Sequence, residues 1–393
     1  MRVALVTHCY PSVEHPYIYD WTRALVRSGV DLTVFCEQVG PDAMPGDGVS
    51  RPRIVEFANL AEPGRSLVRC GVASLRYAFR PLRPLHALRV LAVSDKPKTA
   101  LRKAFEYWPC LHRGFDVVHF NAAQIAIRRF ELGRILGGKV IVSFRGQDFT
   151  FHPDRYDRLL REVDHLHFIS RHLLEEARKR GYLGGRHSLI PPAIDTDFYR
   201  PAPVPQGPEG SRGPYRLFTA ARLTWTKGWE FALQAVAMLV EQGYDIRYHI
   251  AGDGEMRPAV AYAIRQLGLE GRVHLLGWLS PEQVRQQLWE AHVYVLASVG
   301  EAFNNSVLQA QACGVPVVCT DAGGLPENVQ DGVTGLVARR RDPWDLATKI
   351  RCLLDDPERR REMGVAARRR VKEQFSLKDL VPLFLAMYER VCA

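Results

Sequence analysis

Short apolar segments rich in β-branched residues alternate with amphipathic helical patterns along this chain, and the alternation restarts after a proline- and glycine-rich stretch at 200–214. Such alternation is typical of parallel strands joined by helices that cover both faces of a sheet. The strands expected before that stretch are Val3–Thr7, Asp31–Cys36, Asp116–Phe120, Lys139–Phe144, Leu166–Ser170 and Ser188–Ile190. The strands expected after it are Leu217–Ala220, Arg247–Ala251, Val273–Leu276, Val293–Leu296 and Val315–Cys319. The pattern therefore predicts two doubly wound α/β units.

The length of the chain agrees with two domains. Its 393 residues are too many for one ordinary core and suit two α/β domains of roughly 150–200 residues each. We expect an N-terminal domain over 1–199, a linker over 200–214, a C-terminal domain over 215–375 and a final helix over 376–393. Because ligands of doubly wound sheets bind beyond the carboxyl ends of the strands, the two units are expected to face one cleft.

The net charge of +10 is concentrated in the segment 65–113. That segment holds many more Arg and Lys residues than acids, and apolar and aromatic residues lie between them. A basic amphipathic stretch can bind an anionic membrane surface or a phosphorylated acceptor. It can equally be a solvated helical face whose arginines cover apolar surface with their stems. Nucleic acid is not expected as a partner, because no recognition motif accompanies the charge.

No feature of the sequence is typical of a secreted or membrane-spanning protein. No apolar run approaches the ~20 residues that a spanning helix needs. The segment Met1–Thr7 reads as a buried strand rather than a signal peptide. The eight cysteines form no CxxC pair, which favours buried thiols over a disulfide framework or a zinc site. We expect a cytoplasmic protein, with peripheral contact at the inner face of the membrane if 65–113 binds lipid.

The stretch 300–318 carries the clearest chemical signal. The acid Glu301 is followed by small and amide residues, an apolar helix, a turn at Gly314 and a β-branched strand. This order brings a carboxylate and the N-terminus of a helix to one place. Helix N-termini favour anions, because their first N–H groups lack partners within the helix and the dipole is positive there. We expect the anion to be the diphosphate of a sugar nucleotide.

Several motifs, each weak alone, occur in a characteristic order. In the second half they are Ala221–Gly228, Ile250–Gly254, Val273–Leu279, Glu301–Gln309, Ala322–Glu327 and Asp331–Leu336. In the first half they are Tyr10–Glu14, Asp31–Val34, Asp116–His119, Ser143–Asp148 and Ile190–Phe198. Together they resemble the glycosyltransferase family 4 proteins over essentially the whole chain. The resemblance implies the GT-B architecture, with two Rossmann-like domains facing a central cleft and the C-terminal helix crossing back to the first domain.

The resemblance also implies an activity. The chain is expected to transfer a sugar from a nucleotide-diphosphate sugar, a UDP-sugar, to a hydroxyl acceptor, with retention of the anomeric configuration and without a metal or other cofactor. The acceptor would be a glycan, a lipid-linked intermediate or a small molecule, as in polysaccharide, glycolipid or glycosylated-metabolite biosynthesis. A nucleotide-sugar epimerase of the same architecture and an inactive sugar-nucleotide-binding paralogue are the alternatives.

Roles in donor binding follow from the family motifs. The resemblance places Arg222 and Lys227 on the donor diphosphate, where two cations would offset the charge of the leaving group. It places Glu301 on the hydroxyls of the donor sugar. The other donor-binding residues expected from it are Gly252, Asp253, Gly254, Trp278, Asn305, Ser306, Val307 and Gln309.

Three positions depart from the family pattern. Gln309 stands where a second glutamate usually contacts the ribose, and a neutral amide binds hydroxyls more weakly. Arg145 stands where a histidine usually contacts the transferred sugar, and an arginine cannot act as a base at neutral pH. The usual glycine pair of the first loop is replaced by a segment that contains Glu14 and His15, which we assign with Asp148 to the acceptor side.

Two further patterns are given simpler interpretations. The Asp195-Thr196-Asp197 triplet could bind a metal, but it lies in the hinge pattern away from the donor motifs, and no metal site is expected. The arginine clusters at 339–341, 359–361 and 368–370 are most simply solvated helix faces.

Overall fold

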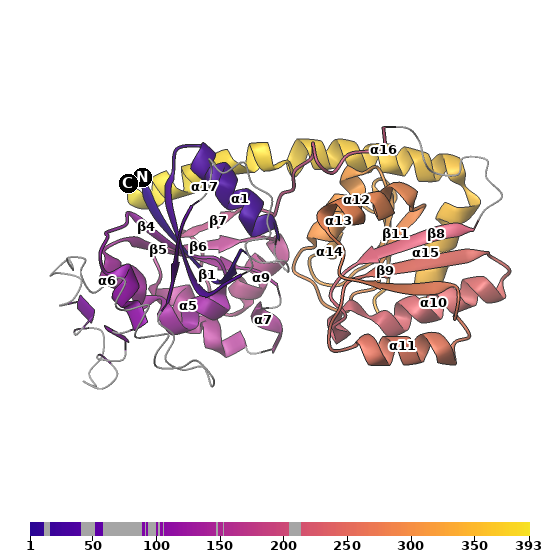
Figure 1. Ribbon diagram of the computed structural model, residues 1–393, viewed down its shortest axis with the longest axis horizontal. Coiled ribbons are helices and arrows are strands. Elements are labelled where there is room, and N and C mark those ends of the chain that lie inside the picture. Colours follow the sequence, from indigo (N-terminus) through magenta and orange to yellow (C-terminus); the bar gives the residue numbers. More distant parts are fainter. Residues whose placement is uncertain are drawn as a thin grey trace. The chain divides into compact units, whose positions relative to one another are not determined.

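The computed structural model describes residues 1–11, 16–40, 52–57, 89–90, 92, 100, 103–104, 106–146, 148–151, 153–203 and 214–393. The chain divides into two compact units (Figure 1). Unit 1 is formed by Met1–Ile169, Leu173–Ile190 and Leu380–Ala393, and unit 2 by Ser170–His172 and Pro191–Asp379. Residues 204–213 of the expected linker lie outside the described residues, as do Glu14, His15 and most of the basic segment 65–113.

Unit 1 contains a parallel sheet of seven strands in the order β3-β2-β1-β4-β5-β6-β7. The strands are β1 Arg2–Tyr10, β2 Asp31–Val39, β3 Arg53–Glu56, β4 Val117–Phe120, β5 Lys139–Phe144, β6 His165–Phe168 and β7 His187–Leu189. The six strands expected from the sequence are confirmed to within a few residues. The edge strand β3 was not predicted, because charged residues lie on both sides of Ile54 and Val55, its only two apolar residues.

Helices cover both faces of this sheet. They are α1 Pro16–Arg27, α5 Ala123–Arg129, α6 Glu131–Leu136, α7 Asp148–Phe151, α8 Asp157–Glu162 and α9 Arg171–Lys179, with short 3-10 turns η1 Trp108–Cys110 and η2 Pro153–Tyr156. The sequence pattern predicts one continuous helix over Gln124–Leu136, and this prediction is wrong, because the helix is interrupted at Phe130. There the N–H of Gly133 donates to the carbonyl of Phe130, three residues earlier, which is the spacing of a 3-10 turn and not of an α-helix.

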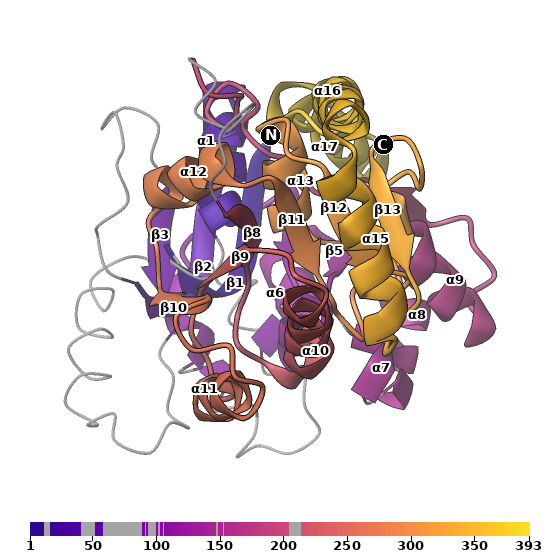
Figure 2. The same ribbon diagram turned by 90° about the vertical axis from the view of Figure 1, so that its right-hand side faces the viewer.

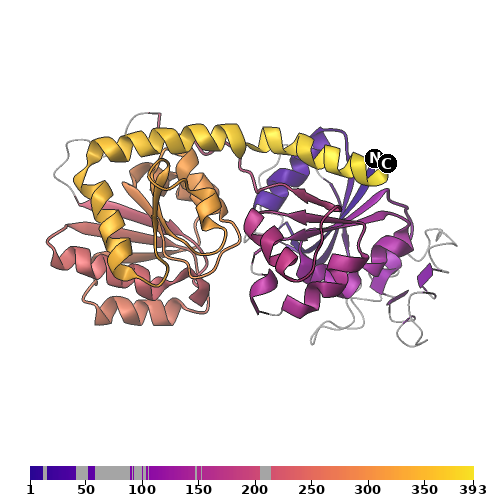
Figure 3. The same ribbon diagram turned by 180° about the vertical axis from the view of Figure 1, so that it is seen from behind.

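The C-terminal helix α17, Leu377–Cys392, belongs to unit 1 from Leu380 on (Figure 3). The ring of its Phe384 lies 4.7 Å from the ring of Trp21 on α1, measured between centroids. Its Tyr388 hydroxyl lies 2.8 Å from Nδ1 of His119 on β4. The predicted return of this helix to the first domain is therefore confirmed.

A buried hydrogen-bonded chain continues from His119 across the sheet of unit 1. Nε2 of His119 lies 2.7 Å from the Ser143 hydroxyl, which lies 2.7 Å from Nδ1 of His167. Nε2 of His167 donates to the carbonyl of Ile190 at 2.8 Å. Burial lowers the pKa of His119 well below its usual value and lowers the pKa of His167 to about 3. Both imidazoles are therefore neutral at physiological pH, and the chain links neighbouring strands without burying a charge.

Unit 2 contains a second parallel sheet, of six strands in the order β10-β9-β8-β11-β12-β13. The strands are β8 Tyr215–Ala220, β9 Ile246–Ala251, β10 Val273–Gly277, β11 Val293–Leu296, β12 Val317–Thr320 and β13 Gly335–Ala338. Five were predicted, and β13 was not assigned as a strand from the sequence. The order reverses between β8 and β11, because the chain extends the sheet from β8 in one direction and from β11 in the other.

Two layers of helices enclose the sheet of unit 2. They are α10 Trp229–Glu241, α11 Arg257–Gln266, α12 Pro281–Glu290, α13 Asn305–Ala312, α14 Leu325–Asn328, α15 Pro343–Asp355 and α16 Pro357–Gln374, with the 3-10 turn η3 Trp225–Lys227. Figures 1 and 2 show α10, α11 and α15 on one face of the sheet and α12, α13 and α16 on the other. The core between the sheet and α10 is built from fully buried aliphatic side chains such as Leu233, Val236 and Ile250.

The interpretation of the arginine cluster at 368–370 as a solvated face is wrong for two of its members. Arg368 donates to the carbonyls of Tyr199, Thr196 and Ala312 at 2.8–2.9 Å. Arg370 donates to the carbonyls of Asn328 and Glu327 at 2.6 and 2.7 Å. Loops and helix ends leave carbonyl groups without partners, and these guanidinium groups satisfy them.

The hinge triplet makes local contacts. The Asp195 carboxylate accepts hydrogen bonds from the N–H groups of Asp197 and Phe198, which closes a turn, and Asp197 forms an ion pair with Lys378 at 2.5 Å. Across the described ranges, no three His, Cys, Asp or Glu side chains gather closely enough to hold a metal ion. Within the same ranges, no helix combines the length and the apolar character needed to cross a membrane.

Candidate functional site

The residues with the strongest chemical signal lie where the strand order of unit 2 reverses. Arg222 and Lys227 follow β8, and Glu301 follows β11, so both loops leave the carboxyl ends of neighbouring strands. The N–H of Val299 donates to the carbonyl of Thr226 at 2.9 Å, which ties the two loops together. This reversal point is where doubly wound sheets bind ligands, because the loops diverge there and leave room between them.

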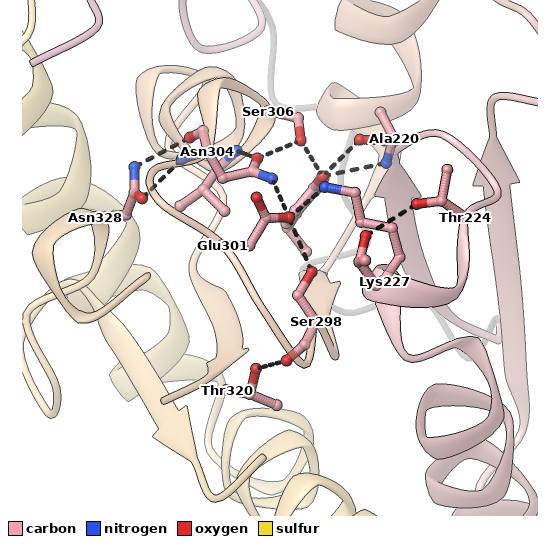
Figure 4. Close-up of polar contacts among 12 residues, drawn as sticks. Ala220, Thr224, Lys227, Ser298, Glu301, Asn304, Ser306, Thr320 and Asn328 are labelled. Carbon is pink, nitrogen blue, oxygen red and sulfur yellow. Dashed lines mark hydrogen bonds and ion pairs between the residues drawn. The ribbon is translucent and has the colours of Figure 1, made fainter. Parts of the chain in front are cut away.

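Glu301 is held by three donors that all bind one carboxylate oxygen (Figure 4). Oε1 accepts from Nζ of Lys227, from the hydroxyl of Ser298 at 3.0 Å and from Nδ2 of Asn304 at 3.2 Å. The side chains of Lys227 and Glu301 are only 14% and 10% exposed. This ion pair is therefore more shielded from solvent than a surface pair, and the contacts direct Oε2 away from the donors.

Lys227 reaches Glu301 because its loop turns sharply. The turn η3 ends at Gly228, whose φ of +64° is a left-handed conformation. A Cβ at that position would lie 2.1 Å from the carbonyl oxygen of Ala297, so only glycine lets the backbone approach this closely. Arg222, five residues before Lys227, is exposed at the start of the same loop.

The Gly252-Asp253-Gly254 segment after β9 packs on the loop that carries Arg222. A Cβ on Gly252 would lie 2.1 Å from the carbonyl oxygen of Ala221, and the N–H of Leu223 donates to the carbonyl of Asp253 at 2.9 Å. The requirement for glycine here thus comes from contact between two protein loops.

Trp278 follows β10 and lies beside that segment. The N–H of Gly252 donates to the carbonyl of Gly277 at 2.7 Å, which joins the ends of β9 and β10. The Trp278 side chain is 54% exposed, so it is not part of the core. Its position at the carboxyl edge of the sheet leaves an aromatic face available to a ligand.

The N-terminus of α13 completes the site. The Asn304 side chain caps the helix, since its Oδ1 accepts from the N–H of Val307 at 3.1 Å. The Val307 N–H, predicted to face the diphosphate, is thus engaged within the protein. Asn305 and Ser306 are half-buried in the first turn, and Gln309 is half-buried one turn further along the helix.

A second set of residues, which was not predicted from the sequence, supports Glu301. Gly324 donates its N–H to the carbonyl of Glu301 at 2.8 Å, and a Cβ on Gly323 would lie 2.1 Å from the same carbonyl oxygen. The Asn328 side chain accepts from the N–H of Asn304 and donates to its carbonyl, both at 3.0 Å. The adjacent glycines in the motif at 322–327 were the available signal, since paired glycines often mark close backbone contact.

Two of the residues assigned to the first domain are described. The Asp148 carboxylate accepts from the N–H of Arg145 at 2.7 Å and lies 3.5 Å from the Tyr156 hydroxyl. Burial raises the pKa of Asp148 to about 7. Asp148 therefore shapes the loop that carries the half-buried Arg145. Glu14 and His15, the other residues of the acceptor-side prediction, lie outside the described residues.

The chain is similar to several characterised proteins. It is 26% identical over 402 residues to the amylovoran biosynthesis glycosyltransferase AmsK of Erwinia amylovora, and the match covers 96% of each chain. It is 31% identical over 214 residues to the 2-deoxystreptamine glucosyltransferase of Streptomyces kanamyceticus, where the match covers 52% of this chain and 54% of that protein. The match to that second relative thus spans about half of its length.

Similarity in fold extends over the whole chain. The crystal structure of Anabaena HepE in complex with UDP and glucose matches with a TM-score of 0.75 at 16% identity, covering 99% of both chains. The family model for Glycosyltransferase Family 4 matches residues 16–198, and the model for Glycosyl transferases group 1 matches residues 207–370. The two models follow one another along the chain as unit 1 and unit 2 do. The chain therefore belongs to the glycosyltransferases of family 4, which have the GT-B fold.

Proposed function

We propose that this chain transfers a sugar from a UDP-sugar to a hydroxyl group of a growing glycan, with retention of the anomeric configuration and without a metal ion. The observation that supports the proposal most strongly is the meeting of Lys227 and Glu301 where the strand order reverses. A cation and a carboxylate there suit the two ends of a sugar nucleotide, the anionic diphosphate and the polyhydroxylated sugar.

Each of the two groups has a definite chemical task in this proposal. Breaking the bond between the sugar and the diphosphate leaves negative charge on the departing phosphate. The ammonium of Lys227 and the guanidinium of Arg222 would stabilise that charge as it develops. The Oε2 atom of Glu301, which points away from the three donors on Oε1, would accept a hydrogen bond from a sugar hydroxyl.

A uridine nucleotide is the proposed carrier. HepE, whose fold matches over nearly its whole length, was solved with UDP. Trp278, exposed beside Gly252, offers an aromatic surface on which the base can stack. Gln309 can hydrogen-bond a ribose hydroxyl as a neutral partner, which predicts weaker ribose binding than a glutamate would give.

A glycan intermediate is the proposed acceptor. The relative whose match covers 96% of both chains is named for the biosynthesis of a polysaccharide, amylovoran. The relative named for a small acceptor, 2-deoxystreptamine, matches only about half of each chain. A lipid-linked glycan would bring the protein to the membrane through the basic segment 65–113. Sedimentation with anionic vesicles, and its loss in an Arg76→Ala/Arg80→Ala/Arg83→Ala variant, tests that contact.

Turnover measurements test the proposed reaction. The protein is incubated in EDTA with a panel of UDP-, GDP- and ADP-sugars, with and without glycan acceptors, and released nucleoside diphosphate is measured. The proposal predicts acceptor-dependent release of UDP and a product whose anomeric proton coupling matches that of the donor. Donor consumption without any acceptor, giving an isomeric sugar, would identify an epimerase. No turnover of any donor would favour the inactive paralogue.

A further inference from the structure

Tyr294, a residue of β11 that no motif identified, lies behind the candidate site. Its side chain is fully buried, and its hydroxyl accepts from the N–H of Ala220, the last residue of β8, at 3.2 Å. The same hydroxyl lies 2.7 Å from the hydroxyl of Ser306 and 3.1 Å from the carbonyl of Ala220. Ser306 is the nearer acceptor. Burial raises the pKa of the Tyr294 phenol, so the group stays protonated and remains a donor.

The hydrogen-bonded chain has one direction, because a backbone group fixes it. The N–H of Val307 can only donate, so the Asn304 atom that it meets at 3.1 Å is the amide oxygen. Ser306 also donates to that oxygen, at 2.7 Å, which leaves the Ser306 lone pairs to accept from Tyr294. The Asn304 amide nitrogen is then directed at Oε1 of Glu301, 3.2 Å away.

We infer that Tyr294 is a positioning residue that acts through Ser306 and Asn304 to fix which oxygen of Glu301 faces the donor sugar. This inference rests on the proposed function, since it assigns Oε2 to the sugar. With Lys227, Ser298 and Asn304 all on Oε1, the carboxylate cannot rotate without breaking several bonds. Loss of the Tyr294 hydroxyl frees the Ser306 hydroxyl to turn away, so the Asn304 amide is held less tightly.

We expect substitution of Tyr294 to lower the affinity for the UDP-sugar but not the affinity for UDP itself. The affinity for UDP, which has no sugar to meet Glu301, should stay within about twofold in Tyr294→Phe. The affinity for the UDP-sugar, or its kcat/KM, should fall by roughly 5- to 10-fold, as expected for one lost hydrogen bond in a network. Ser306→Ala should have the same effect, and Ser306→Thr, which keeps a hydroxyl, should restore most of it.

A matched control is available in the same sheet. Tyr248 on β9 is also buried, and its hydroxyl lies 2.7 Å from the Thr219 hydroxyl. The Thr219 hydroxyl in turn donates to the carbonyl of Val295 and not to Ser306 or Asn304. Tyr248→Phe therefore removes a buried hydroxyl with a similar cost to stability and should leave the ratio of UDP-sugar affinity to UDP affinity unchanged.

The experiment measures calorimetric affinities for UDP and for the UDP-sugar found in the donor panel, with steady-state kinetics and melting temperatures. The variants are Tyr294→Phe, Ser306→Ala, their combination and Tyr248→Phe. If Tyr294 and Ser306 act through one series of hydrogen bonds, the double variant should lose no more UDP-sugar affinity than either single variant. If Tyr294→Phe does not fold, the affinities of Ser306→Ala and Ser306→Thr, at a half-buried position, test the inference instead. Equal losses for UDP and UDP-sugar, or additive losses in the double variant, would overturn the inference alone. No binding of either ligand by the wild type would overturn the proposed function as well.

Discussion

The substitution Gly324→Ala tests whether the loop behind Glu301 sets the geometry of the site. Gly324 has a φ of −87°, which any residue can adopt, so a methyl group adds no backbone strain of its own. The added Cβ would lie 1.8 Å from the carbonyl oxygen of Ala302 and 2.7 Å from its carbonyl carbon. The neighbouring N–H of Gly324 is bonded to the carbonyl of Glu301, so the clash acts directly on the segment that carries the carboxylate.

The expected magnitude follows from that overlap. Ordinary contact between such atoms requires about 3.4 Å or more, so the two backbones must separate by roughly 1.5 Å. Overpacking of this kind typically costs about 1–3 kcal/mol of the free energy of unfolding. A displacement of about 1 Å at a reacting group can reduce the rate by about 100-fold. We therefore expect a folded variant whose kcat/KM for the sugar nucleotide falls by about two orders of magnitude.

A second glycine provides the control. A Cβ on Gly364 of α16 would lie 2.1 Å from the carbonyl oxygen of Gly314. Gly314 lies beyond the C-terminal end of α13, whereas Glu301 precedes its N-terminal end. Gly364→Ala should therefore lower the free energy of unfolding to a similar degree and leave kcat/KM within a few-fold of the wild type.

The measurements are urea denaturation for stability and the UDP-release assay for activity. Both variants should have a lower free energy of unfolding, and only Gly324→Ala should have the roughly 100-fold lower kcat/KM. If Gly324→Ala retains wild-type kcat/KM, the close packing at Ala302 does not set the position of Glu301, and this account of the site is wrong.

Three further predictions concern the two units separately. Burial raises the pKa of Asp148 to about 7, while an aspartate titrates near 4 in the unfolded chain, so stability should fall as the pH rises from about 4 through 7. Asp148→Asn should flatten that fall in thermal melts between pH 5 and 8; an unchanged pH profile would contradict it. Tyr388→Phe leaves Nδ1 of the buried His119 without its partner and should cost about 1–3 kcal/mol in chemical denaturation, equally at pH 6 and pH 8 because this imidazole stays neutral. Arg370→Met removes donors from the carbonyls of Glu327 and Asn328 and should lower the unfolding free energy by about 1–3 kcal/mol, against little change in Arg369→Met, whose side chain is exposed.

The architecture could be predicted because its signals are local. Most strands of the two sheets lie in short apolar segments, many of them rich in β-branched residues, and helical patterns separate these segments, so the alternation can be recognised without knowing any contact. The loop at Glu301 was likewise visible, since an acid before a helix on a strand end has a local sequence signature. Two strands were missed because their surroundings are not typical of a strand. In β3, charged residues flank Ile54 and Val55 on both sides, and β13 begins at Gly335, three residues after Gly332, in a stretch typical of a turn.

The supporting contacts of the site could not be predicted, since they join residues far apart in sequence. Tyr294 reaches Ala220 across 74 positions, and Asn328 reaches Asn304 across 24. Arg370 looked like part of a solvated cluster because its neighbours are charged, yet its guanidinium caps carbonyls 42 and 43 residues away. Such bonds depend on which loops the fold brings together, and the sequence near each residue does not indicate which loops these are.

We propose that the loops after β8 and β11 bind a nucleoside diphosphate. The most direct measurement is a calorimetric titration with UDP, GDP and ADP, in EDTA, of the wild type, Lys227→Ala and Lys372→Ala. Lys372 is an exposed lysine of α16, so Lys372→Ala removes the same positive charge at a position outside these two loops. We expect micromolar binding of UDP that is lost in Lys227→Ala and kept in Lys372→Ala. Binding that survives in Lys227→Ala, or no binding of any nucleotide by the wild type, would contradict it.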